Sequence, residues 1–218
     1  MSADDLDLGD GWIDAELRAE FPELRLHTLD VARGSGRSPT EIRERLRSMS
    51  DRFRGATAIS LRRAPIPSAY RVFFRQVGLD PDAQRVPAEE AAVRRLVKAG
   101  FESQNLLDDA LLIALVETGV PLWALDAEAV DGPLGIRPAR AGEHVGRAED
   151  APWVREDALV VADAQSPVGV LFEPVAAAHA VTKHTTAMTL FAVAVPDVPP
   201  IFVEEAMWTA VSVLEDGG

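Results

Sequence analysis

Cysteine is absent from the 218 residues, which excludes disulfides, thiolate metal sites and a cysteine nucleophile. Lysine is scarce as well, because 20 of the 22 basic residues are arginine. No apolar run reaches the roughly 18 residues of a membrane helix, and the acidic stretch Met1–Asp5 lacks the apolar core of a signal peptide. We therefore expect a cytoplasmic protein that does not interact with membranes.

The motifs of several common enzyme classes are also missing. The chain contains no His-Glu-x-x-His and no Gly-x-Ser-x-Gly. No two histidines have the spacing of three or four residues that places two metal ligands on one helix face. We expect no metal site and no cofactor, with each histidine at the surface or at the edge of the core. A Ser-His-Asp triad stays open, because its members can lie far apart in a sequence.

Charge is distributed unevenly along the chain. The net charge of −13 argues against a general binder of polyanions. Residues 1–32 carry a net charge of −7, residues 33–98 carry +8, and residues 99–218 carry −14. The basic block has two interpretations, a local site for an anion or arginine-rich helix faces that are simply solvated. The sequence alone leaves both open.

Hydrophobic periodicity predicts a helix-rich first part and a strand-rich second part. Ser38, followed by Pro39 and by Glu41 three residues after it, is the predicted N-cap of an arginine-rich helix. This order favours an α+β fold over a doubly wound sheet. We expect an acidic, disordered segment over 1–9 and a single domain over 10–218. The predicted helices cover 38–54, 70–77, 89–98, 105–117 and 202–214, and the predicted strands 122–125, 134–137, 159–162, 168–172 and 188–195.

Acidic residues at turn positions are the first candidates for acid–base chemistry. Carboxylates in pairs can transfer protons, whereas single carboxylates in turns usually bind backbone amides. For Asp131 and Asp163 the turn role is favoured, and for Asp126 and Glu143 both roles stay open. Trp123 follows Pro121 in an apolar run, where a tryptophan is usually a core residue. Its alternatives are a pocket wall or a platform on which a base stacks.

An ordered set of short motifs runs from Tyr70 to Glu143. It contains Tyr-Arg-Val-Phe-Phe-Arg at 70–75, Arg-Arg at 94–95, Asn105, Asp109, Leu-Asp at 125–126, Asp-Gly at 131–132, Gly-Ile-Arg at 135–137 and Ala-Gly-Glu at 141–143. In this order and spacing, the set resembles the editing (B3/B4-type) domain of the phenylalanyl-tRNA synthetase β subunit. It is similar above all to free-standing proteins that consist of that domain alone. The resemblance covers about residues 65–165 and continues weakly to Val195.

The resemblance implies a layered β/β/α fold, with a sandwich-like mixed sheet and helices on one side. It also implies hydrolysis of tyrosine wrongly attached to the tRNA for phenylalanine, a second sieve after aminoacylation. In that family the pocket mainly orients the ester, a water and the ribose hydroxyl, so no catalytic side chain is named. The resemblance assigns phosphate contacts to Arg71, Arg75, Arg94 and Arg95. It assigns the substrate pocket, for an amino acid or its ester, to Asn105, Asp109, Trp123, Asp126, Arg137, Glu143 and Glu173.

The chain departs from the family pattern at several polar positions. The synthetase has a histidine where this chain has Trp123, and the family's asparagine three residues after Asp109 is Leu112. The free-standing members carry Trp-Asn-x-Arg where this chain reads Phe-Glu-Pro-Val from Phe172, so Pro174 is another departure. A polar site that loses its partners is penalised. The alternative function is therefore a non-catalytic module that binds an amino acid, another small molecule or a protein.

Overall fold

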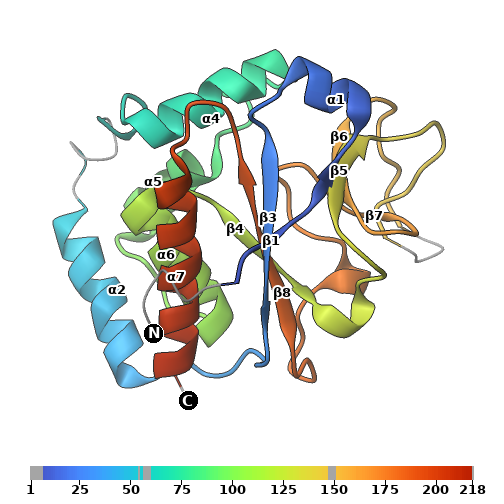
Figure 1. Ribbon diagram of the computed structural model, residues 1–218. Coiled ribbons are helices and arrows are strands. Elements are labelled where there is room, and N and C mark those ends of the chain that lie inside the picture. Colours follow the sequence, from blue (N-terminus) through green and yellow to red (C-terminus); the bar gives the residue numbers. More distant parts are fainter. Residues whose placement is uncertain (1–6, 54, 56–59, 147–150, 218) are drawn as a thin grey trace. The chain divides into compact units, whose positions relative to one another are not determined.

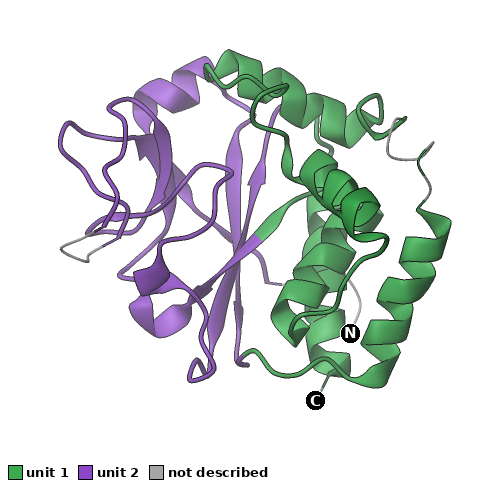
Figure 2. Cartoon of the chain, turned by 180° about the vertical axis from the view of Figure 1, so that it is seen from behind, with its two compact units in different colours: residues 1–6, 35–122, 197–218 green, residues 7–34, 123–196 purple. Residues whose placement is uncertain are grey.

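The computed structural model describes residues 7–53, 55, 60–146 and 151–217, and it divides the chain into two compact units (Figures 1 and 2). Unit 1 comprises residues 1–6, 35–122 and 197–218, and unit 2 comprises residues 7–34 and 123–196. The long helices belong to unit 1. They are α2 (Thr40–Arg52), α4 (Pro65–Gln76), α5 (Pro87–Lys98), α6 (Leu106–Thr118) and α7 (Pro200–Asp216).

Helix α6 is the centre of unit 1. It packs against α2, α5 and α7, and Ala110, Ile113 and Ala114 are fully buried. An apolar surface on all sides is what a helix surrounded by other helices requires. The helix ends at Gly119, whose φ of 80° is the left-handed C-cap conformation that glycine adopts without strain.

The start of α2 differs from the prediction. The helix begins at Thr40 with Pro39 as its N-cap, and no side chain caps it. Ser38 is buried, and its hydroxyl donates a hydrogen bond of 2.6 Å to Asp109 on α6 instead. The predicted capping role of Ser38 was therefore wrong, because its hydroxyl donates to a buried carboxylate of another helix instead.

Unit 2 contains two four-stranded sheets. One has the order β1-β3-β8-β4, in which β3 pairs antiparallel with both β1 and β8. The other has the order β2-β5-β6-β7, in which only the β2–β5 pair is parallel. Short helix α1 (Ala15–Glu20) follows β2 and is capped by Asp14. The strands are β1 (Gly9–Asp10), β2 (Trp12–Ile13), β3 (Arg25–Val31), β4 (Leu122–Asp126), β5 (Gly135–Pro138), β6 (Leu159–Ala162), β7 (Pro167–Val170) and β8 (Met188–Ala194).

Gly11 is the point where the chain passes from one sheet to the other. Its N–H donates to Leu26 of β3, and the next N–H, of Trp12, donates to Leu134 before β5. A methyl group at Gly11 would lie 2.6 Å from the Leu26 side chain and 2.7 Å from the Leu134 carbonyl, so only glycine fits here. Gly9, within the segment expected to be disordered, forms part of β1, while residues 1–6 lie outside the described residues.

The α+β class is confirmed by this architecture, with the long helices in unit 1 and the sheets in unit 2. The predicted helices and strands are found within a few residues of their expected positions. The two-residue strands β1 and β2 were missed, since a strand of two residues has no periodicity to detect. None of the helices in the described ranges is long and apolar enough to cross a membrane.

Candidate ligand site

Strand β4 carries two of the predicted pocket residues, Trp123 and Asp126. The side chains of both contact residues of one long loop. This loop, residues 171–187, connects β7 to β8. Near its start the ring of Phe172 contacts the ring of Trp123. Near its end the hydroxyl of Thr185 donates to the Asp126 carboxylate over 2.5 Å. We refer to it as the 171–187 loop.

The aromatic end of this arrangement consists of three rings. Trp123 stacks on Phe191 of β8 with 5.5 Å between ring centroids, and Phe172 lies 6.1 Å from Trp123 at an angle of 51°. Phe191 is buried, whereas Trp123 and Phe172 are partly exposed. Phe172 also has a φ of 67°, which is rare for a bulky residue and persists only where neighbours hold it. Two of the three rings, Trp123 and Phe172, are therefore partly open to solvent at this end of β4.

The polar end is held by a close backbone approach. Asp126 accepts from Thr185 with one carboxylate oxygen and from the N–H of Glu128 with the other. The Thr185 hydroxyl in turn accepts from the N–H of Thr182 at 3.0 Å. Gly34 lies so close to the Thr185 carbonyl that a side chain there would overlap it. The orientation of Asp126 is therefore fixed by three segments that are far apart in the sequence.

Arg137 and Glu143 form a bidentate ion pair on β5 and the turn that follows it. The guanidinium donates to the two carboxylate oxygens at 2.7 and 2.6 Å, and the N–H of Arg140 donates to one of them. The hydrogen bonds from Arg137 lower the pKa of the Glu143 carboxyl, partial burial opposes that effect, and the Arg140 N–H adds to it. Arg137 and Glu143 are thus each other's main hydrogen-bonding partners. The pair therefore supports the local structure.

Glu173, the remaining pocket candidate in unit 2, is exposed on the 171–187 loop directly after Phe172. Its N–H donates to the carbonyl of Val170, so its backbone is fixed while its carboxylate faces solvent. It is the one carboxylate of the loop, which otherwise carries Lys183 and two histidines as its titratable side chains.

Asn105 and Asp109 belong to unit 1, where they hold the N-terminus of α6. Asn105 is the N-cap, and its side chain accepts from the N–H of Asp108. Asp109 is buried and accepts from the hydroxyls of Ser38 and Ser103 at 2.6 and 2.5 Å and from the N–H of Gln104 at 2.9 Å. Three donors occupy most of the roughly four acceptor sites of a carboxylate, so the main contacts of Asp109 are structural.

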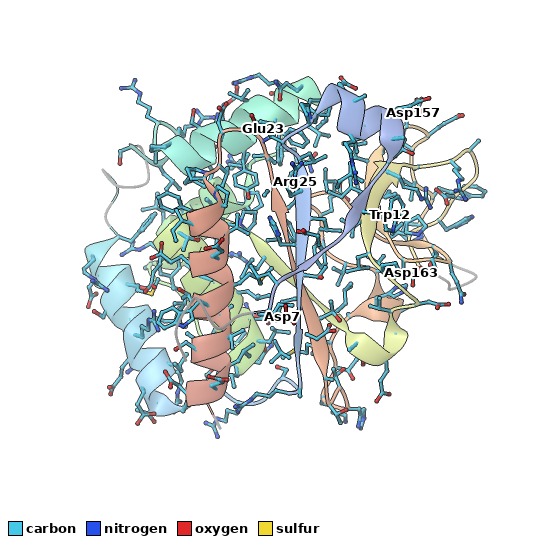
Figure 3. All side chains as sticks on the ribbon, in the orientation of Figure 1. Asp7, Trp12, Glu23, Arg25, Asp157 and Asp163 are labelled. Carbon is cyan, nitrogen blue, oxygen red and sulfur yellow. The ribbon has the colours of Figure 1, made fainter. Side chains whose placement is uncertain are left out.

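Asp163, labelled in Figure 3, has the turn role that its position predicted. It accepts from the N–H groups of Gln165 and Ser166 and from the N–H of Asp131. His179 lies 3.7 Å from the same carboxylate and is 1% exposed. The expectation that every histidine lies at the surface or at the edge of the core was therefore wrong for His179. This side chain is buried next to the buried carboxylate of Asp163.

The family model of the B3/4 domain matches residues 69–207, about two thirds of the chain. This chain belongs to the B3/4 domain family. All eleven residues that the resemblance assigned to a pocket or to phosphate contacts lie within the matched range.

Several phenylalanine–tRNA ligase beta subunits are similar to this B3/4 chain over nearly half its length. The protein of Cutibacterium acnes is 33% identical over 105 residues, 48% of this chain and 12% of that subunit. The Xanthomonas campestris subunit is 33% identical over 94 residues, 43% of this chain and 12% of its own. The Streptomyces avermitilis subunit is 35% identical over 94 residues, 43% and 11% respectively. The chain thus spans about an eighth of the length of these relatives.

The four arginines predicted to bind phosphate have different environments in the B3/4 domain. Arg71 on α4 is buried, and its guanidinium donates to Glu89 at 2.9 Å and to Asp82 at 2.8 Å. Burial alone would lower the pKa of Arg71, but the bonds to Asp82 and Glu89 outweigh it and raise the pKa. Arg75 is exposed, 3.9 Å from Asp82.

On α5 the two consecutive arginines point in different directions. Arg95 is half-buried and donates to the backbone carbonyl of Ser50 on α2 at 2.6 Å. Arg94 is exposed. Among the described residues, neither forms an ion pair with a carboxylate. The structure therefore leaves Arg94 and Arg75 as the predicted phosphate ligands that solvent can reach.

Sequence reasoning missed the parts of this site that depend on pairing distant segments. The Thr185–Asp126 bond and the close approach of Gly34 have no local signature, although glycine in Gly34-Ser35-Gly36 permits such an approach. In the part of the chain that the structure describes, no three His, Asp or Glu side chains gather as a metal site would require.

Proposed function

We propose that this B3/4 domain protein is a free-standing hydrolase of misacylated tRNA. The observation that carries the proposal is membership of the B3/4 family together with similarity to phenylalanine–tRNA ligase beta subunits. The ligase that those names describe joins an amino acid to tRNA. A separate domain of the same family has a clear use in removing wrongly attached amino acids, because one apolar pocket cannot reject every close analogue.

The candidate site offers what ester hydrolysis by positioning requires. The rings of Trp123 and Phe172 form an apolar wall for the side chain of the attached amino acid. Asp126, fixed by Thr185, and the exposed Glu173 supply hydrogen-bond acceptors on the same loop and strand. Acceptors of this kind can orient a water or the ribose hydroxyl, and orientation alone can lower a barrier by several kcal/mol. No side chain is needed as a nucleophile.

A deacylation assay tests this function directly. The tRNA for phenylalanine is charged with tyrosine, and release of the amino acid is followed with and without the protein. We expect wild-type protein to accelerate release, and Trp123→Ala to slow it at least tenfold, because the wall that positions the ester is removed. Correctly charged phenylalanyl-tRNA serves as the control substrate. Intact tyrosyl-tRNA after incubation with folded wild-type protein would refute the proposed activity.

The aromatic wall also favours a second function, a module that binds an amino acid without turnover. Where the synthetase resembled by this chain has a histidine, Trp123 makes the wall more apolar. A module of this kind would bind free aromatic or aliphatic amino acids, measurable by calorimetry, while leaving every aminoacyl-tRNA intact. Trp123→His separates the two functions, because under the binding function it weakens affinity and creates no hydrolysis.

A further inference from the structure

The connection between β5 and β6 contains two paired segments, residues 139–146 and 151–158, which we call the β5–β6 ribbon. Two backbone hydrogen bonds of 2.9 Å join residues 143–145 to residues 152–154. They bracket an antiparallel pair formed by His144 and Trp153. In a pair of this kind the two side chains lie close together on one side of the ribbon.

One side of the β5–β6 ribbon faces the core of unit 2, and the other faces solvent. Val154 belongs to a buried cluster with residues of β6, and Val145 packs against that cluster. Successive side chains of an extended segment point to opposite sides. Trp153 and Arg155, on either side of the buried Val154, therefore point outward, and both are exposed. Polar residues usually occupy such an outward side, so a tryptophan there indicates contact with another molecule.

Trp153 differs from every other aromatic residue of the chain. The structure describes all the tryptophan, tyrosine and phenylalanine residues, and the others are buried or partly buried, whereas Trp153 is 70% exposed. Its ring centroid lies 3.9 Å from that of His144, and its Cζ3 would lie 3.6 Å from a Cβ at Gly142. The His144 ring is itself fixed, because Nδ1 donates to the Ala151 carbonyl over 2.6 Å. The protein thus holds one side of the indole and leaves most of its surface open.

The surroundings of the ring favour one kind of partner. A stable protein interface buries roughly 1,000 Å² or more around an apolar centre, whereas the outward side of the ribbon presents a single aromatic ring. His144 and Arg155 share that side, and a cationic group over the ring would have to approach Arg155. A single flat ring of fixed orientation matches one nucleobase. Stacking on aromatic side chains is a general way of binding unpaired RNA bases.

The charge of the ribbon favours contacts with bases over contacts with phosphates. Residues 139–158 contain three arginines and five carboxylates, a net charge of −2. Glu143 is bound by Arg137, while Glu156 and Asp157 are exposed. Phosphate contacts contribute little affinity on a surface with this balance. An RNA bound here has to be held mainly through its bases.

The β5–β6 ribbon contacts the loop that carries part of the candidate site. A methyl group at Gly146 would lie 3.0 Å from the Cβ of Ala176 and 3.9 Å from that of Ala178. Both alanines belong to the 171–187 loop, which begins beside Trp123. The ribbon and this loop are therefore adjacent within unit 2.

We propose that Trp153 is a stacking platform for an unpaired base of the RNA substrate. The proposal rests on the proposed function for the identity of the ligand, and it adds how that RNA is recognised. Arg155, on the same side of the ribbon, can bind the phosphate of the stacked nucleotide. Because the ring is fixed before binding, stacking costs little side-chain entropy. Trp153 is thus a contact for RNA, whereas Trp123 forms the wall for the amino acid.

Fluorescence anisotropy with a labelled single-stranded RNA of about eight nucleotides, and with its blunt-ended duplex, tests the platform. We expect wild type to bind the single strand about tenfold more tightly, because bases inside a duplex are not available for stacking. Trp153→Ala should weaken binding of the single strand about tenfold. The slope of log affinity against log salt should stay unchanged, since no charge is lost. Trp153→Phe keeps a ring and should retain most of the affinity. The control Ile201→Ala removes another exposed apolar side chain, in unit 1, and should bind like wild type.

Each contrary result overturns the platform. Equal losses in Trp153→Ala and Trp153→Phe, with unfolding curves like that of wild type, would show that the ring does not act by stacking. Wild-type affinity in Trp153→Ala would show that RNA does not contact the ring. Wild-type protein that bound an arginine-rich peptide but no RNA would replace the base with a cationic partner.

The hydrolase function is tested separately, with tyrosine-charged tRNA for phenylalanine. If wild type hydrolyses this ester and Trp153→Ala does so with unchanged KM, the platform is wrong and the function stands. If wild type leaves the ester intact but binds single-stranded RNA through Trp153, the function fails and the platform stands. Where both are correct, Trp153→Ala raises KM by about the loss in affinity and leaves kcat nearly unchanged, because the lost contact is the same in the ground and transition states.

Discussion

Arg137 and Glu143 meet through two parallel hydrogen bonds of 2.7 and 2.6 Å, six residues apart in the chain. The pair joins β5 to the turn after it, and both side chains are mostly buried. Because a bidentate pair fixes direction as well as distance, it holds the start of the β5–β6 connection in one geometry. Its contribution to stability can be measured through its pH dependence.

We expect Glu143→Gln to lower the free energy of unfolding by about 2 kcal/mol at neutral pH, because the buried Arg137 loses its charged acceptor. The folded-state pKa of Glu143 is lowered by Arg137, so the pair's contribution is complete above the unfolded pKa of about 4.3 and is lost as pH falls through the folded pKa. Urea unfolding at several pH values measures the difference between variant and wild type. Glu156→Gln, at an exposed position, is the control. A difference that stays constant on acidification would contradict the role of the ion pair.

The bond between Thr185 and Asp126 gives a second prediction. Thr185→Val keeps the shape of the side chain but removes the donor to Asp126 and the acceptor for the N–H of Thr182. We expect a loss of about 1–3 kcal/mol in unfolding free energy and faster amide exchange in the 171–187 loop. Thr186→Val, at the exposed neighbouring position, should change neither. Unchanged exchange in the Thr185 variant would show that the loop is held by other contacts.

Several elements of the fold could be predicted because their signals are local. The continuous apolar character of α6, the turn chemistry of Asp163 and the β-prone run of β8 each depend on residues close in sequence. Ser38 shows where prediction from local sequence fails. Its local sequence is that of a capping box, yet the buried carboxylate of Asp109, 71 residues away, is the stronger acceptor. A charge-assisted hydrogen bond in the interior is more favourable than an exposed cap.

In the candidate site, local sequence predicts even less of what the structure shows. Arg71 and Arg94 look alike in the sequence, but one is buried between Asp82 and Glu89 and the other is exposed. Which arginine is matched to a carboxylate depends on how α4 and the segment before α5 pack, and that has no signature in composition or spacing. The set of candidate phosphate contacts could therefore be reduced only once the helices were placed.

Asp109 gives a third prediction, on stability rather than on ligand binding. Its three donors all lie in unit 1, and removing the carboxylate would leave the buried hydroxyl of Ser38, the hydroxyl of Ser103 and the N–H of Gln104 without their acceptor. We expect Asp109→Ala to lower the unfolding free energy by about 3 kcal/mol, whereas Asp108→Ala, at an exposed position of the same helix, should cost about 1 kcal/mol or less. Thermal unfolding of both variants checks this. Equal losses would show that Asp109 is not the residue that holds the start of α6.

Gly34 and Gly36 lie in one short segment, and an added methyl group should have different effects at the two positions. A methyl group at Gly34 would overlap the backbone carbonyl of Thr185, whereas one at Gly36 would meet no atom within 4 Å. Backbone cannot move aside as a flexible side chain can, so we expect Gly34→Ala to cost about 1–3 kcal/mol and to displace Thr185 from Asp126. Gly36→Ala should be neutral or slightly stabilising, because alanine restricts the unfolded chain. Unfolding measurements give the two energies, and amide exchange at Thr185 reports the displacement. If both variants were equally stable, the close approach would not be what fixes Thr185. If Gly34→Ala also slowed deacylation in proportion to the displacement, the bond between Thr185 and Asp126 would be tied to the proposed chemistry as well as to the fold.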